Sequence, residues 1–247
     1  MIFRSLALLV ASLVSINLFA LPANLVPAMV NLDRQYIPAL GLSGQPDQLA
    51  KAKTAFLGFE STWNSFRSGI ASQPGFDGEW GADLAKIDQV VQKAKAALIG
   101  DSNGPKAHEE LEAVRMTLLD ARQRQKVPYF VDYLTLYHNS MEDLINGKPA
   151  KPLKDWSATE KLGFAADLDI SIARWNKLRA MEGLLPDYAL AAAAQGTYTA
   201  QWQTIASIMS GIKIASEAGD DKAFAEKFGQ LKPNFIKTFF LFGDFPR

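Results

Sequence analysis

Apolar side chains recur every three or four residues along most of this 247-residue chain, and this spacing limits the folds open to it. Residues at such intervals share one face of a helix, and that face must be buried against another helix. The pattern is interrupted by short polar segments rich in glycine and proline, and no segment shows the two-residue alternation typical of strands. The sequence therefore predicts an all-α fold, a four-helix-bundle-like assembly of about seven to eight helices.

Proline and capping residues predict several helix boundaries. The segment Ser-Ala-Thr-Glu at 157–160 has the spacing of a capping box, so a helix should begin there. Pro233 is expected to divide the last helical stretch into two short helices. Residues 21–48 contain four prolines, and we expect them to form a largely extended lead-in with one short helix around 32–40.

Two similar pentapeptides suggest an internal repeat. Residues 63–67 (WNSFR) and 175–179 (WNKLR) share Trp-Asn-x-apolar-Arg. A duplicated helical unit would divide the all-α domain, 49–247, into half one at about 49–146 and half two at about 157–247, with the polar segment between them as the boundary. The alternative is chance, because short likenesses between amphipathic helices are common.

The N-terminus resembles a secretory signal. Arg4 gives a positive start, residues 6–19 form an apolar run, and Ala20 is a small residue at a plausible cleavage point. A membrane anchor is the alternative, but this run is shorter than the roughly 20 apolar residues that span a bilayer. We therefore expect residues 1–20 to be a cleaved signal peptide. Because the chain has no cysteine, and so no disulfides, a bacterial periplasm is the expected location.

Composition restricts the classes of function. The formal net charge is zero and becomes −1 once residues 1–20, which contain only Arg4 as a charged residue, are removed. Such a chain has no electrostatic reason to bind nucleic acid or an anionic membrane, and we expect no integral membrane segment in the mature chain. The absence of cysteine excludes thiolate metal sites, iron–sulfur clusters and cysteine nucleophiles. No sequence signature of a known catalytic site is present, so an enzyme is the minority interpretation.

One of the two histidines has neighbours that could form a ligand site. His138, Met141 and Glu142 stand at i, i+3 and i+4, so their side chains leave the same side of a helix. Imidazole and thioether groups together suit a soft metal such as Cu(I), or the axial positions of haem b. In the alternative interpretation His138 bonds Glu142 at the rim of the core and Met141 is ordinary core filling.

The second histidine, His108, is a weaker candidate. It precedes Glu112 by four residues, but the short segment 122–128 should make the two histidine-bearing helices antiparallel, which offsets the two histidines by roughly 10 Å along the bundle. Arg115 and the aromatic Tyr137 are further candidates for contact with an anionic or apolar ligand. Arginines beside apolar faces more often bond a helix carboxylate.

The expected architecture is similar to that of the b562-type soluble cytochromes, although no motif is shared. In that family one Met and one His from different helices ligate haem. His138 and Met141 share a helix, so a haem site would need a methionine from elsewhere, such as Met116 or Met209. Two functions remain open: a ligand-binding protein with copper ahead of haem, and a structural or adaptor bundle that presents helix faces to another envelope protein.

Overall fold

The chain forms eight α-helices in the computed structural model, which describes residues 22–73, 76 and 78–246. No strand occurs in this described part, so the predicted all-α fold is confirmed. The predicted signal peptide lies outside the described residues. The helices are α1 Leu25–Ser43, α2 Leu49–Gly69, α3 Gly78–Lys95, α4 Gly104–Arg124, α5 Phe130–Gly147, α6 Ala158–Ala180, α7 Ala192–Ala218 and α8 Asp221–Phe240.

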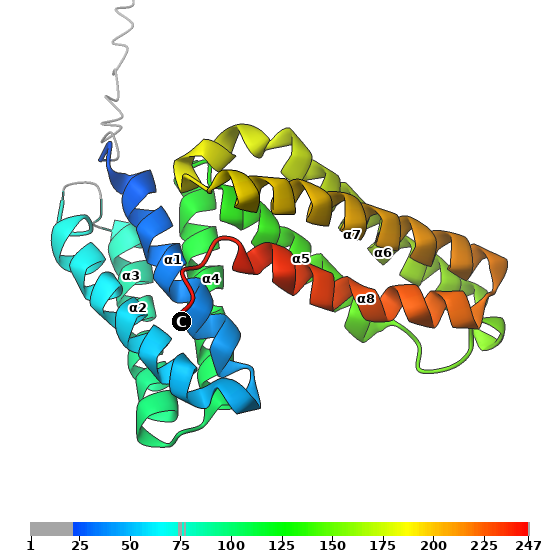
Figure 1. Ribbon diagram of the computed structural model, residues 1–247, viewed down its shortest axis with the longest axis horizontal. Helices are drawn as coiled ribbons and strands as arrows, with labels where there is room; N and C mark the ends of the chain where they lie inside the picture. The colour runs from blue at the N-terminus through cyan, green and yellow to red at the C-terminus, as the bar shows by residue number, and fades with distance from the viewer. Residues whose placement is uncertain (1–21, 74–75, 77, 247) are drawn as a thin grey trace, which may run out of the picture.

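The eight helices are arranged as two four-helix groups whose long axes diverge (Figure 1). In the first bundle, α1 packs on α2 and on α4, and α3 packs on α4. In the second bundle, α5 packs on α6 and α7 packs on α8. The short segment 125–129 connects the two bundles, and Lys126 within it has a φ of 55°. We call the region where α1 and α4 meet the second bundle the joint.

The structure places the division between the bundles earlier in the chain than the predicted boundary at about 146–157. That segment instead joins α5 to α6 within the second bundle. The predicted lead-in is also wrong in part, because residues 25–43 form α1, with twelve buried residues. Pro27 is tolerated in the first turn, where helix N–H groups lack partners. Pro38 leaves the carbonyl of Arg34 without its helical donor, and the N–H of Asp244 donates to it at 2.8 Å.

The second predicted proline break is absent, because α8 continues through Pro233. Pro233 and Gly229, whose carbonyl loses its helical donor, are both exposed, so water can satisfy that carbonyl. On the opposite side Phe235 and Phe239 are buried and hold the helix in place. Tertiary packing therefore overrides the local preference for a break. The capping box at Ser157 and Glu160 is present as predicted.

The two similar pentapeptides lie on the second helix of each bundle. The Trp63 indole N–H of α2 donates to Asp88 of α3 at 2.8 Å, and the Trp175 indole N–H of α6 donates to the Trp202 carbonyl of α7 at 3.0 Å. Both indoles thus bond the third helix of their bundle. The duplication itself stays a prediction, because two unrelated four-helix bundles could also have a tryptophan at this position.

Buried apolar side chains from both bundles form one continuous core that crosses the joint. Among the helices described here, none combines the length and the apolar character needed to cross a membrane. The joint is therefore part of the folded interior, and polar groups placed there need partners within the protein.

Candidate functional site

His138 lies at the joint, in a chain of polar side chains that crosses from the first bundle to the second. Glu112 and Arg115 come from α4, His138 and Glu142 from α5, and Lys232 from α8. We call these five residues the His138 centre. Their positions follow from helical spacing, because Glu112 with Arg115 and His138 with Glu142 are i,i+3 and i,i+4 pairs.

Both ring nitrogens of His138 face charged partners. The Nη2 atom of Arg115 lies 2.9 Å from Nδ1, and the Oε1 atom of Glu142 lies 3.6 Å from Nε2. Because a guanidinium can only donate, Nδ1 accepts and the ring proton is placed on Nε2, toward Glu142. Burial, with the charges of Arg115 and Lys232, lowers the pKa of His138 to about 3. His138 is therefore a neutral imidazole inside an ion-pair network.

The other predicted metal ligands are not arranged around an ion. Met141 is wholly buried in the core, and Glu142 lies 2.8 Å from the ammonium of Lys232. In the part of the chain that the structure describes, no three His, Asp or Glu side chains are grouped so that they could hold a metal. A metal at Nδ1 of His138 would have to displace the guanidinium of Arg115. The geometry thus favours the alternative in which His138 is a packed, hydrogen-bonded residue.

His108 belongs to the same polar chain without touching His138. Its Nδ1 lies 2.8 Å from the Leu40 carbonyl of α1, and its Nε2 lies 3.7 Å from Glu112. The Glu112–Arg115 ion pair thus lies between the two histidines. The expected antiparallel packing of the two histidine-bearing helices is wrong, since α4 packs mainly on α3 and α5 mainly on α6.

The remaining candidates have partners of their own. Tyr137 is wholly buried against the ring of Trp175 at 4.5 Å, and its hydroxyl lies 3.8 Å from the sulfur of Met209. The sulfur of Met116 lies 3.4 Å from the side-chain amide of Asn139. Arg115 is almost completely buried and forms an ion pair with Glu112. These contacts are those of a packed interior, and Tyr137 lines neither of the cavities described below.

Sequence reasoning missed a second polar group at the joint. Arg122 of α4 donates from Nε to both carboxylate oxygens of Asp132 on α5, at 3.0 and 2.9 Å, and its Nη2 also pairs with Asp132. Tyr129 donates its hydroxyl to Asp33 of α1 at 2.6 Å, while its ring lies 4.2 Å from the guanidinium carbon of Arg122. We call Asp33, Arg122, Tyr129 and Asp132 the Asp33 centre.

The Asp33 centre is closed to solvent, and this changes its proton affinity. Burial raises the pKa of Asp33 to about 6, while Arg122 and the Tyr129 hydroxyl act in the opposite direction. A sequence signal was available, because Asp33 lies among Met29, Val30, Tyr36 and Ile37 on the apolar face of α1. A charged residue on such a face predicts a buried ionic partner.

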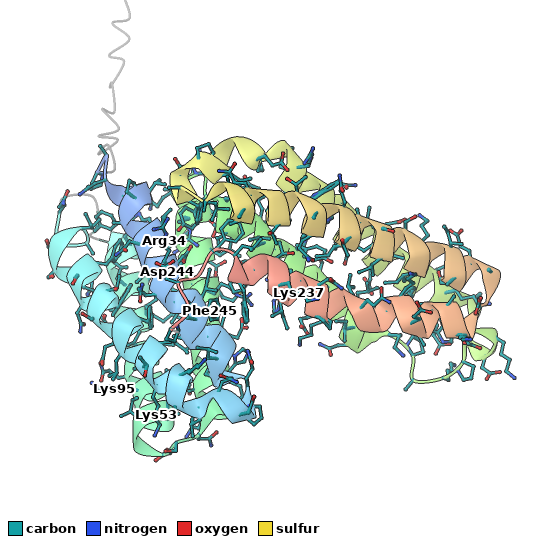
Figure 2. The ribbon with its side chains drawn as sticks, in the orientation of Figure 1. Arg34, Lys53, Lys95, Lys237, Asp244 and Phe245 are labelled. Atoms are coloured by element: carbon teal, nitrogen blue, oxygen red, sulfur yellow. The ribbon has the colours of Figure 1, made fainter. Side chains whose placement is uncertain are left out.

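The C-terminal segment 241–246 covers the same joint. The ring of Phe242 is buried against Phe130 of α5 and Tyr188, the last residue of the 3-10 helix Glu182–Tyr188. Figure 2 shows Asp244 beside Arg34 of α1, whose carbonyl accepts the Asp244 N–H. A Cβ on Gly243 would lie 2.9 Å from Ile37 and Pro38, so this position requires glycine. The apolar C-terminus therefore packs into the protein's own core.

Two small cavities lie outside both polar centres. One, of about 310 Å³, is lined by Lys148, Trp156 and Asp221 at the far end of the second bundle. The other, of about 280 Å³, lies beside Arg34 and Asp244. Both are at or below the lower limit of volumes usual for small-molecule sites.

Comparison with known proteins identifies no family for this chain. Neither a protein-family model, nor a curated protein, nor a solved structure matches it significantly.

Proposed function

We propose that the protein is an exported adaptor bundle that binds a partner through helix surfaces and is not a catalyst. The polar residues that could have formed a ligand site are paired with one another at the joint. Export is supported by the pattern of residues 1–20 and by the absence of cysteine. Copper binding at His138 and Met141 is less well supported, because Arg115 and Lys232 already pair with His138 and Glu142, and Met141 is wholly buried in the core.

The observation that carries the proposal is a group of exposed aliphatic side chains on the outer surface of α6 and α7. Residues 188–212 contain no charged side chain. Three large aliphatic side chains are exposed on these two helices: Leu162 (73%), Ile170 (48%) and Ile214 (64%). Over residues 192–212 the exposed residues of α7 are uncharged, and include Ala193, Gly196, Ala200, Thr204, Ser207 and Ser210. Exposed charged residues, among them Lys161, Asp169 and Lys213, stand next to the three aliphatic side chains in the sequence. We call this surface the α6–α7 face.

The two helices of this face are held side by side. The indole N–H of Trp202 and that of Trp175 each donate to the other residue's carbonyl, at 3.4 and 3.0 Å, and Lys213 pairs with Asp169 at 2.9 Å. Leu162 and Ile170 of α6 and Ile214 of α7 therefore project from neighbouring helices. Exposed aliphatic groups on a rigid surface are typical of sites where proteins bind. The partner that fits best is an envelope protein that presents an apolar helix.

The proposal is tested with a photo-crosslinking residue at Ala166, which is exposed on α6. We expect one defined protein adduct in native envelopes, and its loss in the double variant Leu162→Glu/Ile214→Glu, because a charge on the face must be desolvated on binding. Leu57→Glu is the matched control, because Leu57 is 51% exposed but belongs to the first bundle. Absence of any adduct, or equal loss in the control, would contradict the proposal.

The adduct must also be reproduced with purified components. The crosslinked partner, once purified, should bind the wild-type protein and the Leu57→Glu variant equally and should bind the double variant at least 10-fold more weakly, a difference of about 1.4 kcal/mol. Export is checked separately by the mass of the mature chain, which should begin close to Leu21.

A further inference from the structure

The Asp33 centre holds two carboxylates but only one guanidinium in a space closed to water. Arg122 directs its hydrogen bonds to Asp132, and Asp33 receives only the hydroxyl of Tyr129. If both carboxylates were ionised, the centre would carry one uncompensated negative charge. A buried charge without a partner is costly, and a proton on one carboxylate removes that cost. Asp33 has the weaker set of partners and is therefore the carboxylate that takes the proton.

In the part of the chain that the structure describes, Arg122 is the cation that compensates Asp33. The charged or titratable groups that face Asp33 are Arg122 from α4, Tyr129 from the connecting segment, Asp132 from α5, Tyr36 from its own helix and Tyr188. On its own helix, Arg34 directs its guanidinium to the Tyr188 carbonyl at 2.6 Å. Among the described residues, α2 faces α1 with apolar groups such as Phe56 and Phe59, and the C-terminal segment contributes the backbone N–H of Asp244.

We propose that Asp33 carries a proton when the two bundles are docked, and that loss of this proton to solvent loosens the joint, which makes the joint a pH-sensitive contact. The hydrogen-bond partner of Asp33, Tyr129, comes from the connecting segment, and Asp132 comes from α5 across the contact, whereas Arg122 lies on α4 of the same bundle as Asp33. Separation of the bundles would hydrate the carboxylate while leaving the helix pairs α1–α2, α3–α4, α5–α6 and α7–α8 intact. Protonation therefore favours docking, and ionisation favours the open arrangement.

One backbone group reports directly on this contact. The Asp244 N–H of the C-terminal segment, which follows α8, donates to the Arg34 carbonyl of α1 at 2.8 Å. This hydrogen bond crosses the joint and breaks when the joint opens. With a pKa of about 6 when docked and the ordinary 3.8 when hydrated, Asp33 should lower the ratio of docked to open protein about 10-fold between pH 5 and pH 7.

The experiment compares hydrogen exchange of the Asp244 amide in wild type and in Asp33→Asn, which keeps an acceptor for Tyr129 but cannot ionise. Comparison at the same pH cancels the intrinsic pH dependence of exchange. We expect the ratio of protection, wild type over variant, to fall about 10-fold from pH 5 to pH 7. Asp47→Asn, at an exposed aspartate, is the matched control and should show a constant ratio.

Amides inside the bundles distinguish local opening from global unfolding. Those of Phe56 on α2 and Leu168 on α6 should exchange much more slowly than that of Asp244. If all three amides have equal protection in wild type, or if the protection ratio does not change with pH, the proposal is wrong.

A direct titration keeps the test valid if Asp33→Asn does not fold. The ¹³C shift of the Asp33 carboxyl in the wild-type protein should titrate near pH 6, and the protection of the Asp244 amide should change with the same midpoint. A carboxyl midpoint near 4, the ordinary value for aspartate, would overturn the proposal.

Discussion

The Asp33 centre and the His138 centre both join α4 of the first bundle to α5 of the second, but they differ in how far water reaches them. In the Asp33 centre the side chains of Arg122 and Asp132 are 2% and 7% exposed. In the His138 centre Arg115 is 5% exposed, but its partner Glu112 is 29% exposed. Each arginine is buried, and only one of them has a buried carboxylate partner.

This difference gives the two centres opposite responses to pH. In the Asp33 centre burial raises the pKa of a carboxyl to about 6, so acid stabilises the folded protein there. In the His138 centre burial and two cations lower the pKa of an imidazole to about 3, so acid destabilises it. A buried titratable group without a counter-ion of its own favours its neutral form, whether its charged form would be positive or negative.

The largest expected effect separates the two arginines. Arg122→Met should lower the free energy of unfolding by about 3–5 kcal/mol, because it leaves two carboxylates in a space closed to water. Arg115→Met should cost about 1–2 kcal/mol, because Glu112 can turn toward solvent and His138 is neutral. Urea denaturation of both variants at pH 7 measures the two values. A cost for Arg115→Met equal to or larger than that for Arg122→Met would contradict the comparison of the centres.

A smaller effect is expected where the C-terminal segment covers the Asp33 side of the joint. Gly243→Ala places a Cβ 2.9 Å from Ile37 and Pro38, and should cost about 1–3 kcal/mol of stability by overpacking. Gly229→Ala is the control, since that glycine is exposed on α8 with no atom near its Cβ position. The control should be neutral or stabilise by up to about 1 kcal/mol. Thermal unfolding that ranked the two variants in the reverse order would show that the segment is not tightly docked.

The smallest effect concerns metal binding at the His138 centre. Under reducing conditions a Cu(I) titration should show no stoichiometric uptake, because Arg115 occupies Nδ1 of His138. Met141→Leu should leave the titration unchanged and cost less than about 1.5 kcal/mol of stability. Uptake of about one equivalent, weakened by this substitution, would restore the soft-metal interpretation of His138 and Met141.

The helical architecture could be predicted from the sequence because apolar spacing and the capping box at Ser157 are local signals. The helix that replaces the expected lead-in could not be predicted, since Pro38 is tolerated in α1 only because the Asp244 N–H, 206 residues further along the chain, bonds the free carbonyl. Pro233 was misleading for a similar reason, because packing of the opposite face of α8 holds that helix together. Local sequence patterns contain no information about such distant donors and contacts.

The candidate site was predictable in part. Glu142 was correctly expected beside His138, because i,i+4 neighbours follow from helical geometry. The contact between Arg115 and Nδ1 of His138 was not expected, because the angle between α4 and α5 depends on the connecting segment and on the Arg122–Asp132 pair. A charged residue on an apolar helix face, such as Asp33 or Asp132, was the signal that sequence reasoning left unused.

The opposite pH responses of the two centres are tested most directly by the unfolding free energy of three proteins between pH 4 and pH 7. The stabilising contribution of Asp33 is complete below about pH 3.8 and is lost as pH rises through 6, a total of about 3 kcal/mol. The contribution of His138 is complete above pH 6.5 and is lost as pH falls toward 3, by at most about 1.4 kcal/mol per pH unit. On acidification, Asp33→Asn should therefore lose stability relative to wild type, and His138→Gln should gain it, with wild type between them. Parallel curves for the three proteins would contradict the account.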